Sequence, residues 1–470
     1  MKKILQMIAC TLCVFVVGCS DFLEEESQDE VIPETAKDFG ELLLGSGYPS
    51  PSGDAGYIVS YMDDDNEIDI EKTYNLGSSN ADNLFPYLTW QPNMFQWNEE
   101  LSAGTTDYYK FYDRIKGCNA VLDYIDDAVG SQAERDQVKA EALALRALHY
   151  FWLVNLYGEP YNDNKTALGV PLKLNSSVME KGLPRNTVEE VYEQIVEDLR
   201  ASETLFEQYD VVIGNYKVNL PAVRILLSRV YLYMEEWELA AEAATDAIAT
   251  AGSLTDLTAL DESTSIYMNT YDHSEIVWLY GGSVSGASGS ILRFSDSFLD
   301  LFDDSDRRVG IYFMVQNGSY IYSKNQASYE PGQMLRTAEA YLNRAEAYAH
   351  IEGKQQDAMN DLNALRAKRI EGYQEETISD VEALIEAIRT ERRKELCFEG
   401  HRWFDLRRYE MPSIKHVFQN SEDSPVMEFV LEEKDPMYTL PLPASVTREN
   451  TALVQNSSAY GEERTGEIVQ

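Results

Sequence analysis

The chain has 470 residues and a formal net charge of −41, because 80 Asp and Glu residues outnumber 39 Lys and Arg residues. This surplus of negative charge excludes nucleic acid and anionic membrane surfaces as partners. With 44% apolar and 11% aromatic residues the chain can still bury a large core, so we expect a globular protein and not a disordered acidic tail.

The N-terminus predicts export and lipid attachment. Lys2 and Lys3 precede an apolar run that ends in Val16-Val17-Gly18-Cys19. A basic start followed by about 15 apolar residues is typical of a signal peptide and is too short for a membrane-spanning helix. A Cys directly after this Gly resembles a bacterial lipobox, which implies that residues 1–18 are removed and that Cys19 carries a lipid anchor in the membrane. An ordinary signal peptide, in which Cys19 has no role, is the alternative.

An acidic leader follows Cys19. The stretch Ser20-Asp21-Phe22-Leu23-Glu24-Glu25-Glu26 resembles the export signal that places Bacteroidetes lipoproteins on the cell-surface side of the outer membrane, with the periplasmic side as the alternative. We interpret residues 19–38 as a lipidated acidic tether and residues 39–470 as a single domain.

The first part of this domain, residues 39–100, predicts loops because it is rich in Gly, Pro, Asn, Asp and aromatic residues. Apolar periodicity then predicts helices over 108–125 and 137–157, the second apolar on nearly all sides and therefore buried. Thr187 and Glu190 have the spacing of a capping box that begins another helix.

The two Cys residues in the body of the domain fall in apolar helical stretches. Cys118 and Cys397 are interpreted as buried free thiols that pack as small apolar side chains. A disulfide or a reactive Cys is the alternative.

Two stretches match the pattern of tetratricopeptide helix pairs. Residues 221–250 and 338–369 both place small or apolar residues where two helices of a pair approach closely, namely Leu227, Ser228, Tyr231, Ala240, Ala244 and Ala247 in the first, and Gly353, Ala358, Leu362 and Leu365 in the second.

These patterns predict a mostly α fold. We expect a tetratricopeptide-like scaffold of helical pairs near 104–157, 187–250 and 335–400, with a loop-rich, ligand-binding portion and a few short strands. The loop-rich parts are residues 39–100 and 252–334, and within the second part 275–280 and 319–322 are predicted strands.

Several sequence landmarks occur in a fixed order. They are Leu145-Arg146-Ala147-Leu148-His149-Tyr150-Phe151-Trp152, Arg185-Asn186-Thr187-Val188-Glu189-Glu190, Glu391-Arg392-Arg393-Lys394-Glu395-Leu396, Glu399-Gly400-His401-Arg402-Trp403-Phe404-Asp405-Leu406-Arg407-Arg408, Leu440-Pro441-Leu442-Pro443 and Val454-Gln455-Asn456. Behind a lipobox, they resemble the SusD/RagB family of nutrient-binding outer-membrane lipoproteins over nearly all of the mature chain.

The resemblance implies a protein that binds and does not catalyse, and that needs no cofactor. Such a protein sits as a lid on a SusC-like TonB-dependent outer-membrane transporter and hands it an oligosaccharide. A lid that binds oligopeptides is the alternative within the same family. A surface adhesin or structural lipoprotein is a more distant one.

The charged stretch 391–408 fits either an anion-binding or catalytic site or a set of structural ion pairs. Oppositely charged residues three apart on a helix lie close enough to pair. We therefore expect structural pairs between Arg392 and Glu395 and between Arg402 and Asp405.

The sequence predicts neither a metal site nor catalysis. Its five His residues lack the spacing of a zinc site, and the chain has no G-x-S-x-G elbow. The acidic run Asp63–Asp69 is interpreted as a solvated loop, with a calcium site as the alternative, because the Gly and the terminal Glu of an EF-hand are not at their offsets. Carboxylates as numerous as these do not by themselves indicate a glycosidase.

The aromatic segment from Asn80 to Asn98 carries the ligand-site prediction. Flat rings interleaved with amides and carboxylates suit a sugar, whose C–H faces stack on rings while its hydroxyls form hydrogen bonds. Core packing is the rival interpretation, and we expect Phe85 and Phe95 to be core while one of Trp90 and Trp97 is exposed. The predicted ligand-binding residues are Asn80, Asp82, Asn83, Tyr87, Trp90 and Trp97, followed by Tyr267, Trp278 and Tyr320.

Overall fold

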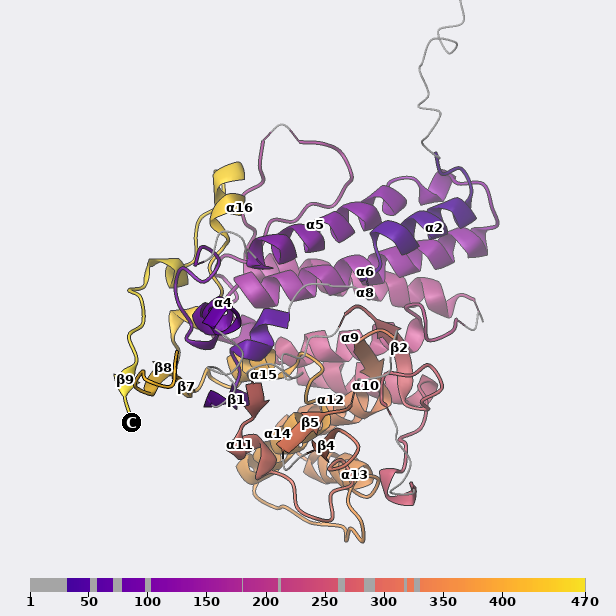
Figure 1. Cartoon of the computed structure of the whole chain (residues 1–470). Coiled ribbons are helices and arrows are strands. Elements are labelled where there is room, and N and C mark those ends of the chain that lie inside the picture. The colour runs from indigo at the N-terminus through magenta and orange to yellow at the C-terminus, as the bar shows by residue number, and fades with distance from the viewer. Residues whose placement is uncertain are drawn as a thin grey trace, which may run out of the picture.

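The computed structural model describes residues 32–50, 57–70, 78–97, 103–179, 181–209, 213–260, 267–282, 292–316, 319–324 and 330–469. This part of the chain is mostly helical with a few short strands, as predicted (Figure 1). The lipobox at Cys19 and the acidic leader lie outside the described residues. Within the described part, no helix has both the length and the apolar character needed to cross a membrane.

Four helices lie side by side in the upper part of the molecule (Figure 1). They are α2 (Ala36–Ser46), α5 (Ala103–Leu122), α6 (Gln132–Tyr157) and α8 (Val188–Glu207). Helix α6 contacts both α5 and α8 and is buried on nearly all sides, which confirms its prediction. Helix α8 begins at the predicted capping box, in which the backbone N–H of Thr187 donates to Glu190 Oε2 at 2.8 Å and that of Glu190 donates to Thr187 Oγ1 at 3.2 Å.

The tetratricopeptide-like pairs form the lower part. Their helices are α9 (Leu220–Tyr233), α10 (Trp237–Thr250), α12 (Thr337–His350), α13 (Gln355–Arg366) and α14 (Val381–Glu395). Helices α9 and α10 form one pair and α12 and α13 another, and α12 also contacts α10 and α14. The predicted packing residues Ala240, Ala247, Ala358 and Leu362 are buried. Gly353 turns the chain between α12 and α13 at φ +80°, where a side chain would be strained.

The strands are short and pair antiparallel. They are β1 (Asn66–Ile68), β2 (Ile276–Tyr280), β3 (Leu292–Phe294), β4 (Phe313–Gln316), β5 (Ser319–Tyr322), β6 (Gln333–Arg336), β7 (Ile414–Phe418), β8 (Met427–Leu431) and β9 (Glu467–Ile468). β1 pairs with β3, β2 with β6 and β4 with β5, and β7, β8 and β9 form a three-stranded sheet. The strands predicted at 275–280 and 319–322 are therefore confirmed as β2 and β5.

Shorter helical segments connect these elements. They are α4 (Ser78–Leu88), α7 (Tyr161–Asn164), α11 (Asp296–Leu299), α15 (Arg402–Arg408) and α16 (Ala444–Glu449), together with the 3-10 turns η3 (Tyr57–Tyr61), η5 (Ile125–Asp127), η6 (Leu257–Ala259), η7 (Pro436–Tyr438) and η8 (Ser457–Tyr460).

The N-terminal part contains helices where loops were predicted. Helix α2 begins at a capping box, because the N–H of Asp38 donates to Thr35 Oγ1 at 3.1 Å and the N–H of Thr35 donates to Asp38 Oδ2 at 2.9 Å. Helix α4 has Pro86 in its last turn and packs against η3. Its polar composition and Pro hid it from a search for apolar periodicity.

The acidic run at Asp63 is not a solvated loop, so that interpretation is wrong: Asp63 and Asp65 are buried, and Asp64 and Asp65 are ion-paired. Asp64 accepts from Arg402 Nε at 2.6 Å and Nη2 at 2.7 Å, and Asp65 accepts from Arg393 Nε at 2.7 Å. Burial alone would raise the pKa of Asp64, but the charge and hydrogen bonds of Arg402, together with Arg393, lower it to about 2. Among the described side chains, no group of three or more His, Cys, Asp or Glu is arranged to hold a metal ion.

Both Cys residues of the domain are buried free thiols, as predicted. Cys118 lies within α5, and Cys397 lies two residues beyond the end of α14. Burial is the main cause that raises the pKa of each thiol to about 12, so both stay protonated and unreactive at neutral pH.

Candidate functional site

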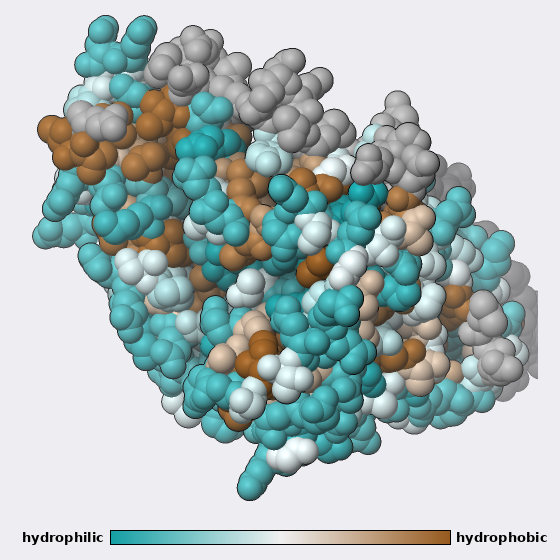
Figure 2. All heavy atoms as spheres, turned by 90° about the horizontal axis from the view of Figure 1, so that it is seen from below, coloured by the Kyte–Doolittle hydropathy of each residue, from teal (hydrophilic) through white to brown (hydrophobic). Residues whose placement is uncertain are grey.

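An aromatic pocket of about 460 Å³ lies where the end of the α4 segment meets the β7–β8 hairpin. The ring of Phe85 lies 5.1 Å from that of Trp97, 4.9 Å from that of Phe418 and 5.6 Å from that of Phe429. Trp97 is 38% exposed, so part of its ring is open to solvent. Figure 2 shows hydrophobic residues gathered at the surface on the left, the side where Figure 1 places β7, β8 and β9.

Contacts with the core fix both sides of the pocket, the strand β7 and the turn that contains Trp90. In β7 alternate side chains face inward, so Phe418 lies on the same face as His416. The His416 ring stacks on Trp90 at 4.4 Å, and Trp90 Nε1 donates to the carbonyl of Met62 at 3.0 Å. Trp90 has φ +50°, an uncommon angle for a large residue, and these contacts fix the turn that leads to Trp97.

The rim of the pocket is polar. Asn420 and Ser424 line it from the turn between β7 and β8. That turn is braced internally, because Gln419 Nε2 donates to the Ser424 carbonyl at 2.8 Å and the Ser421 N–H donates to Ser424 Oγ at 2.8 Å. Asn420 itself is exposed at the rim. Aromatic rings below an amide and a hydroxyl give a small site that can stack a flat apolar face and orient its polar groups.

Of the predicted ligand residues, Trp97 lines this pocket. We expected one of Trp90 and Trp97 to be exposed, and Trp97 is the exposed one. Trp90 and Tyr87 are buried instead, at 0% and 5% exposure, so neither offers a free ring face. Phe95 is core, as expected, whereas Phe85 is only half-buried and lines the pocket.

The remaining predicted ligand residues do not line this pocket. Trp278 is fully buried because its strand, β2, is covered on both faces. Its ring stacks on that of Tyr280, with 4.3 Å between the centroids. Tyr320 is 42% exposed on β5, while Tyr267 and Asn83 are partly buried. The side chains of Asn80 and Asp82 lie outside the described residues.

Sequence reasoning missed Phe418, Met427 and Phe429, which complete the pocket. The alternation of apolar residues in 414–418 and 427–431 is a strand pattern that could have indicated the hairpin. Its position beside residue 97 is a tertiary contact across more than 300 residues and leaves no local pattern.

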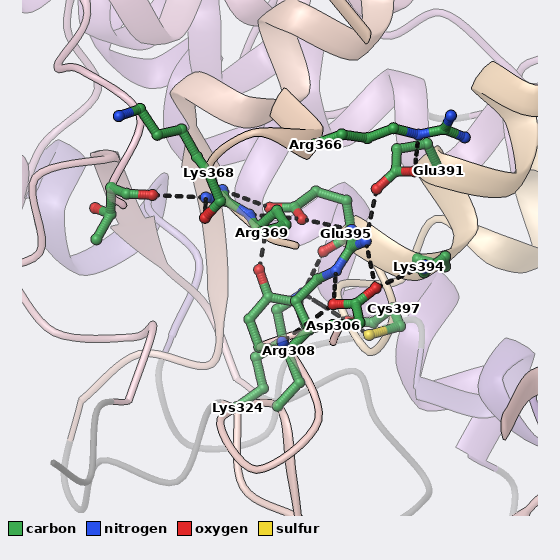
Figure 3. A network of polar contacts seen from close by, with 12 residues as sticks. Asp306, Arg308, Lys324, Arg366, Lys368, Arg369, Glu391, Lys394, Glu395 and Cys397 are labelled. Atoms are coloured by element: carbon green, nitrogen blue, oxygen red, sulfur yellow. Dashed lines mark hydrogen bonds and ion pairs between the residues drawn. The ribbon is translucent and has the colours of Figure 1, made fainter. Parts of the chain in front are cut away.

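The charged stretch 391–408 forms a buried ion-pair network around Glu395 (Figure 3). Glu395 contacts Arg336 Nη1 at 2.6 Å, Arg369 Nη2 at 2.9 Å and Arg308 Nη1 at 3.0 Å, and each of these side chains is fully buried. Tyr312 donates to the same carboxylate at 3.0 Å. A carboxylate so fully occupied by protein donors is not available to a substrate, which supports the structural interpretation of the network.

The individual pairs predicted for this stretch are wrong. Arg392 pairs with Asp405 at 2.9 Å, and Arg402 pairs with Asp64 at 2.6 Å. The prediction assumed partners on the same helix, whereas the fold brings closer partners from other segments.

Two family models match the chain. One is that of the SusD family, over residues 302–460, and the other is described as starch-binding, associating with the outer membrane, over residues 21–232. A SusD-like protein of Bacteroides ovatus is 24% identical over 249 residues, a match that covers 50% of this chain and 40% of that protein. The match therefore spans less than half the length of this relative.

Solved structures share the fold. A SusD superfamily protein of Bacteroides thetaiotaomicron is 24% identical with a TM-score of 0.71, and the match covers 90% of this chain and 99% of that one. A SusD-like carbohydrate binding protein of Bacteroides vulgatus is 22% identical with a TM-score of 0.68, and the match covers 89% of this chain and 97% of that one. At this identity the likeness concerns the fold, and function has to be argued from the site.

Proposed function

The chain belongs to the SusD/RagB family, and from this premise we propose that it binds an oligosaccharide at the outer membrane and delivers it, without catalysis, to a partner TonB-dependent transporter. The family description of starch binding in association with the outer membrane supports the class of ligand and the location. Delivery to a transporter rests on the family resemblance.

The single observation that carries glycan binding is the partly exposed ring of Trp97 in the aromatic pocket. A pyranose ring stacks its C–H face on an indole while its hydroxyls reach amides and hydroxyls at the rim, such as those of Asn420 and Ser424. A volume of about 460 Å³ accommodates one or two sugar units, and the open rim lets a longer chain continue into solvent.

Replacing Trp97 with Ala is expected to weaken glycan binding about 30-fold, because an anchoring aromatic residue contributes about 2 kcal/mol or more to binding. The melting temperature should change little, since the side chain is partly exposed. The measurement is calorimetric titration of the purified domain with a panel of neutral oligosaccharides and oligopeptides, beside a thermal melt.

Two other Trp variants serve as controls. Trp237→Ala removes a partly buried ring that stacks on His350 at 4.0 Å outside the pocket, and should leave affinity unchanged. Trp90→Ala removes a core ring and should destabilise the protein by about 3–5 kcal/mol. Glycan affinity that survives Trp97→Ala would refute the pocket as the site, and binding of peptides alone would refute the class of ligand.

We also propose that Cys19 anchors the protein, lipidated, to the surface side of the outer membrane. In Cys19→Ala no thiol remains to be acylated, so the variant is expected to leave the membrane fraction almost completely, because two or three buried acyl chains provide the attachment. Fractionation and protease accessibility of whole cells measure this. A variant that stays membrane-bound to the wild-type level contradicts the anchor, and lipidated protein that is protected from protease in whole cells contradicts the surface location.

A further inference from the structure

A groove of about 330 Å³ between α14 and α15 gathers three arginines in a strongly acidic protein. Arg389 and Arg393 project from one face of α14, and Arg402 from the start of α15. Leu301, Leu406 and Pro412 form its apolar walls. It is separate from the aromatic pocket, since the two share no lining residue.

Two of the arginines are held in place by carboxylates behind them. Arg402 donates through Nε and Nη2 to Asp64, and Arg393 donates through Nε to Asp65. Asp64 and Asp65 therefore balance these two charges. The side chains of Arg393 and Arg402 are only 12% and 16% exposed, so these two arginines serve the groove mainly as walls.

Arg389 differs because no carboxylate of the described residues is hydrogen-bonded to it. Within the described part of the chain its Nε is buried without a hydrogen-bond partner and forms only a long ion pair, at 3.8 Å, with the carboxylate of Glu346. Glu346 is already engaged by Arg408, at 2.6 Å and 2.8 Å. The charge of Arg389 is therefore less fully matched than those of Arg393 and Arg402.

Stacking holds the Arg389 guanidinium in a fixed orientation. It lies over the Tyr409 ring at 4.1 Å from the centroid, and Arg408 lies against the same ring at 4.3 Å. Because Arg389 Nε is buried, a guanidinium held in this way can bind a planar anion in two parallel hydrogen bonds only through its two Nη groups. The side chain of Arg389 is 29% exposed, so a ligand can reach it.

We propose that this groove is a second ligand site, which binds the carboxylate of an acidic sugar unit through Arg389. Thr390 also lines the groove and has a hydroxyl to offer, and the apolar walls pack against the C–H face of the sugar. Glu386 lines the same groove one helical turn before Arg389 and opposes anions at short range, and the net charge of the protein opposes them at long range, so binding depends on the contacts of Arg389. The choice of a sugar rests on the proposed function, whereas the choice of a carboxylate rests on the geometry of Arg389.

The test is calorimetric titration of the purified domain with glucuronate and, as the uncharged match, glucose. Glucuronate is expected to bind at least about tenfold more tightly, and Arg389→Ala to remove that difference, because the carboxylate then loses its charge-assisted hydrogen bonds. Arg448→Ala, which changes an exposed arginine on α16, should have no effect. Should Arg389→Ala melt early, Arg389→Lys keeps the charge but not the paired geometry, and it should still weaken glucuronate binding.

The outcomes separate this site from the aromatic pocket. Trp97→Ala should leave glucuronate binding unchanged, so loss of neutral-glycan binding alone concerns the pocket and loss of glucuronate preference alone concerns the groove. Equal binding of glucose and glucuronate, or unchanged glucuronate binding in both Arg389 variants, overturns the carboxylate site. Glutamate that binds as tightly as glucuronate overturns the assignment to a sugar.

Discussion

Replacing Glu395 with Gln is expected to lower the free energy of unfolding by about 3–5 kcal/mol, because it removes the charge that three buried arginines share. Arg308, Arg336 and Arg369 are fully buried and all contact this carboxylate. The Gln amide has the same volume, but its NH₂ group places N–H donors opposite the N–H donors of the arginines. Urea denaturation of the purified domain measures the loss, and a loss below about 1 kcal/mol would contradict the central role of Glu395.

The same variant should change the dependence of stability on pH. Burial alone would raise the pKa of Glu395, but the charges of Arg369, Arg336 and Arg308 hold it well below its ordinary value of 4.5. Its contribution is therefore present above about pH 4.5 and is lost as the pH falls, since the unfolded chain takes up a proton there that the folded chain does not. The difference between wild type and Glu395→Gln should shrink below pH 4.5. Glu382→Gln, at an exposed position in the first turn of α14, is the matched control and should cost less than about 1 kcal/mol.

The scaffold could be predicted from the sequence because its helices carry local patterns. The apolar residues of 137–157 and the Ala residues of the two tetratricopeptide-like pairs repeat at helical spacing, and the helices form where the pattern lies. Helix α2 also carries a local pattern, the capping box of Thr35 and Asp38. Helix α4 has no apolar periodicity in its sequence, and its packing against η3 is a tertiary contact that the sequence does not reveal.

The candidate site could be predicted only in part, because burial and neighbours are tertiary properties. Trp90 and Trp97 have similar sequence surroundings, yet one stacks on His416 in the core and the other is exposed. The partners of Trp97 on β7 and β8 lie far along the chain. The arginines of 391–408 could likewise be predicted only in part. Helical spacing gives the possible ion pairs within a helix, but not the partners from distant segments that replace them, such as Asp64 for Arg402.

Arg185 is the point at which two of the sequence landmarks meet. The first contains Arg185 itself, and the second is the closing Val454-Gln455-Asn456. The guanidinium donates to the carbonyls of Gly169, Tyr157 and Leu168 at 2.6–2.7 Å, to that of Val454 at 2.9 Å and to Asn456 Oδ1 at 2.7 Å. Burial is the main cause that lowers its pKa to about 10, so it remains charged at neutral pH and its hydrogen bonds are charge-assisted.

Arg185→Ala is therefore expected to lower the free energy of unfolding by about 4 kcal/mol, because the oxygens around the guanidinium lose a charged hydrogen-bond donor and a cavity opens. Arg185→Lys should lose about half as much, since an ammonium group has three donors and cannot span the same oxygens. Arg448→Ala, exposed on α16, is the control and should stay within about 0.5 kcal/mol of wild type. Besides urea denaturation, hydrogen exchange should show faster opening of 454–460 in Arg185→Ala, because this segment loses the hydrogen bonds through which Arg185 links it to the end of α6. Unchanged exchange in that segment would contradict this role of Arg185 and would mean that other contacts hold the segment, such as the hydrogen bonds that Asn456 Nδ2 donates to the carbonyls of Tyr157 and Leu440.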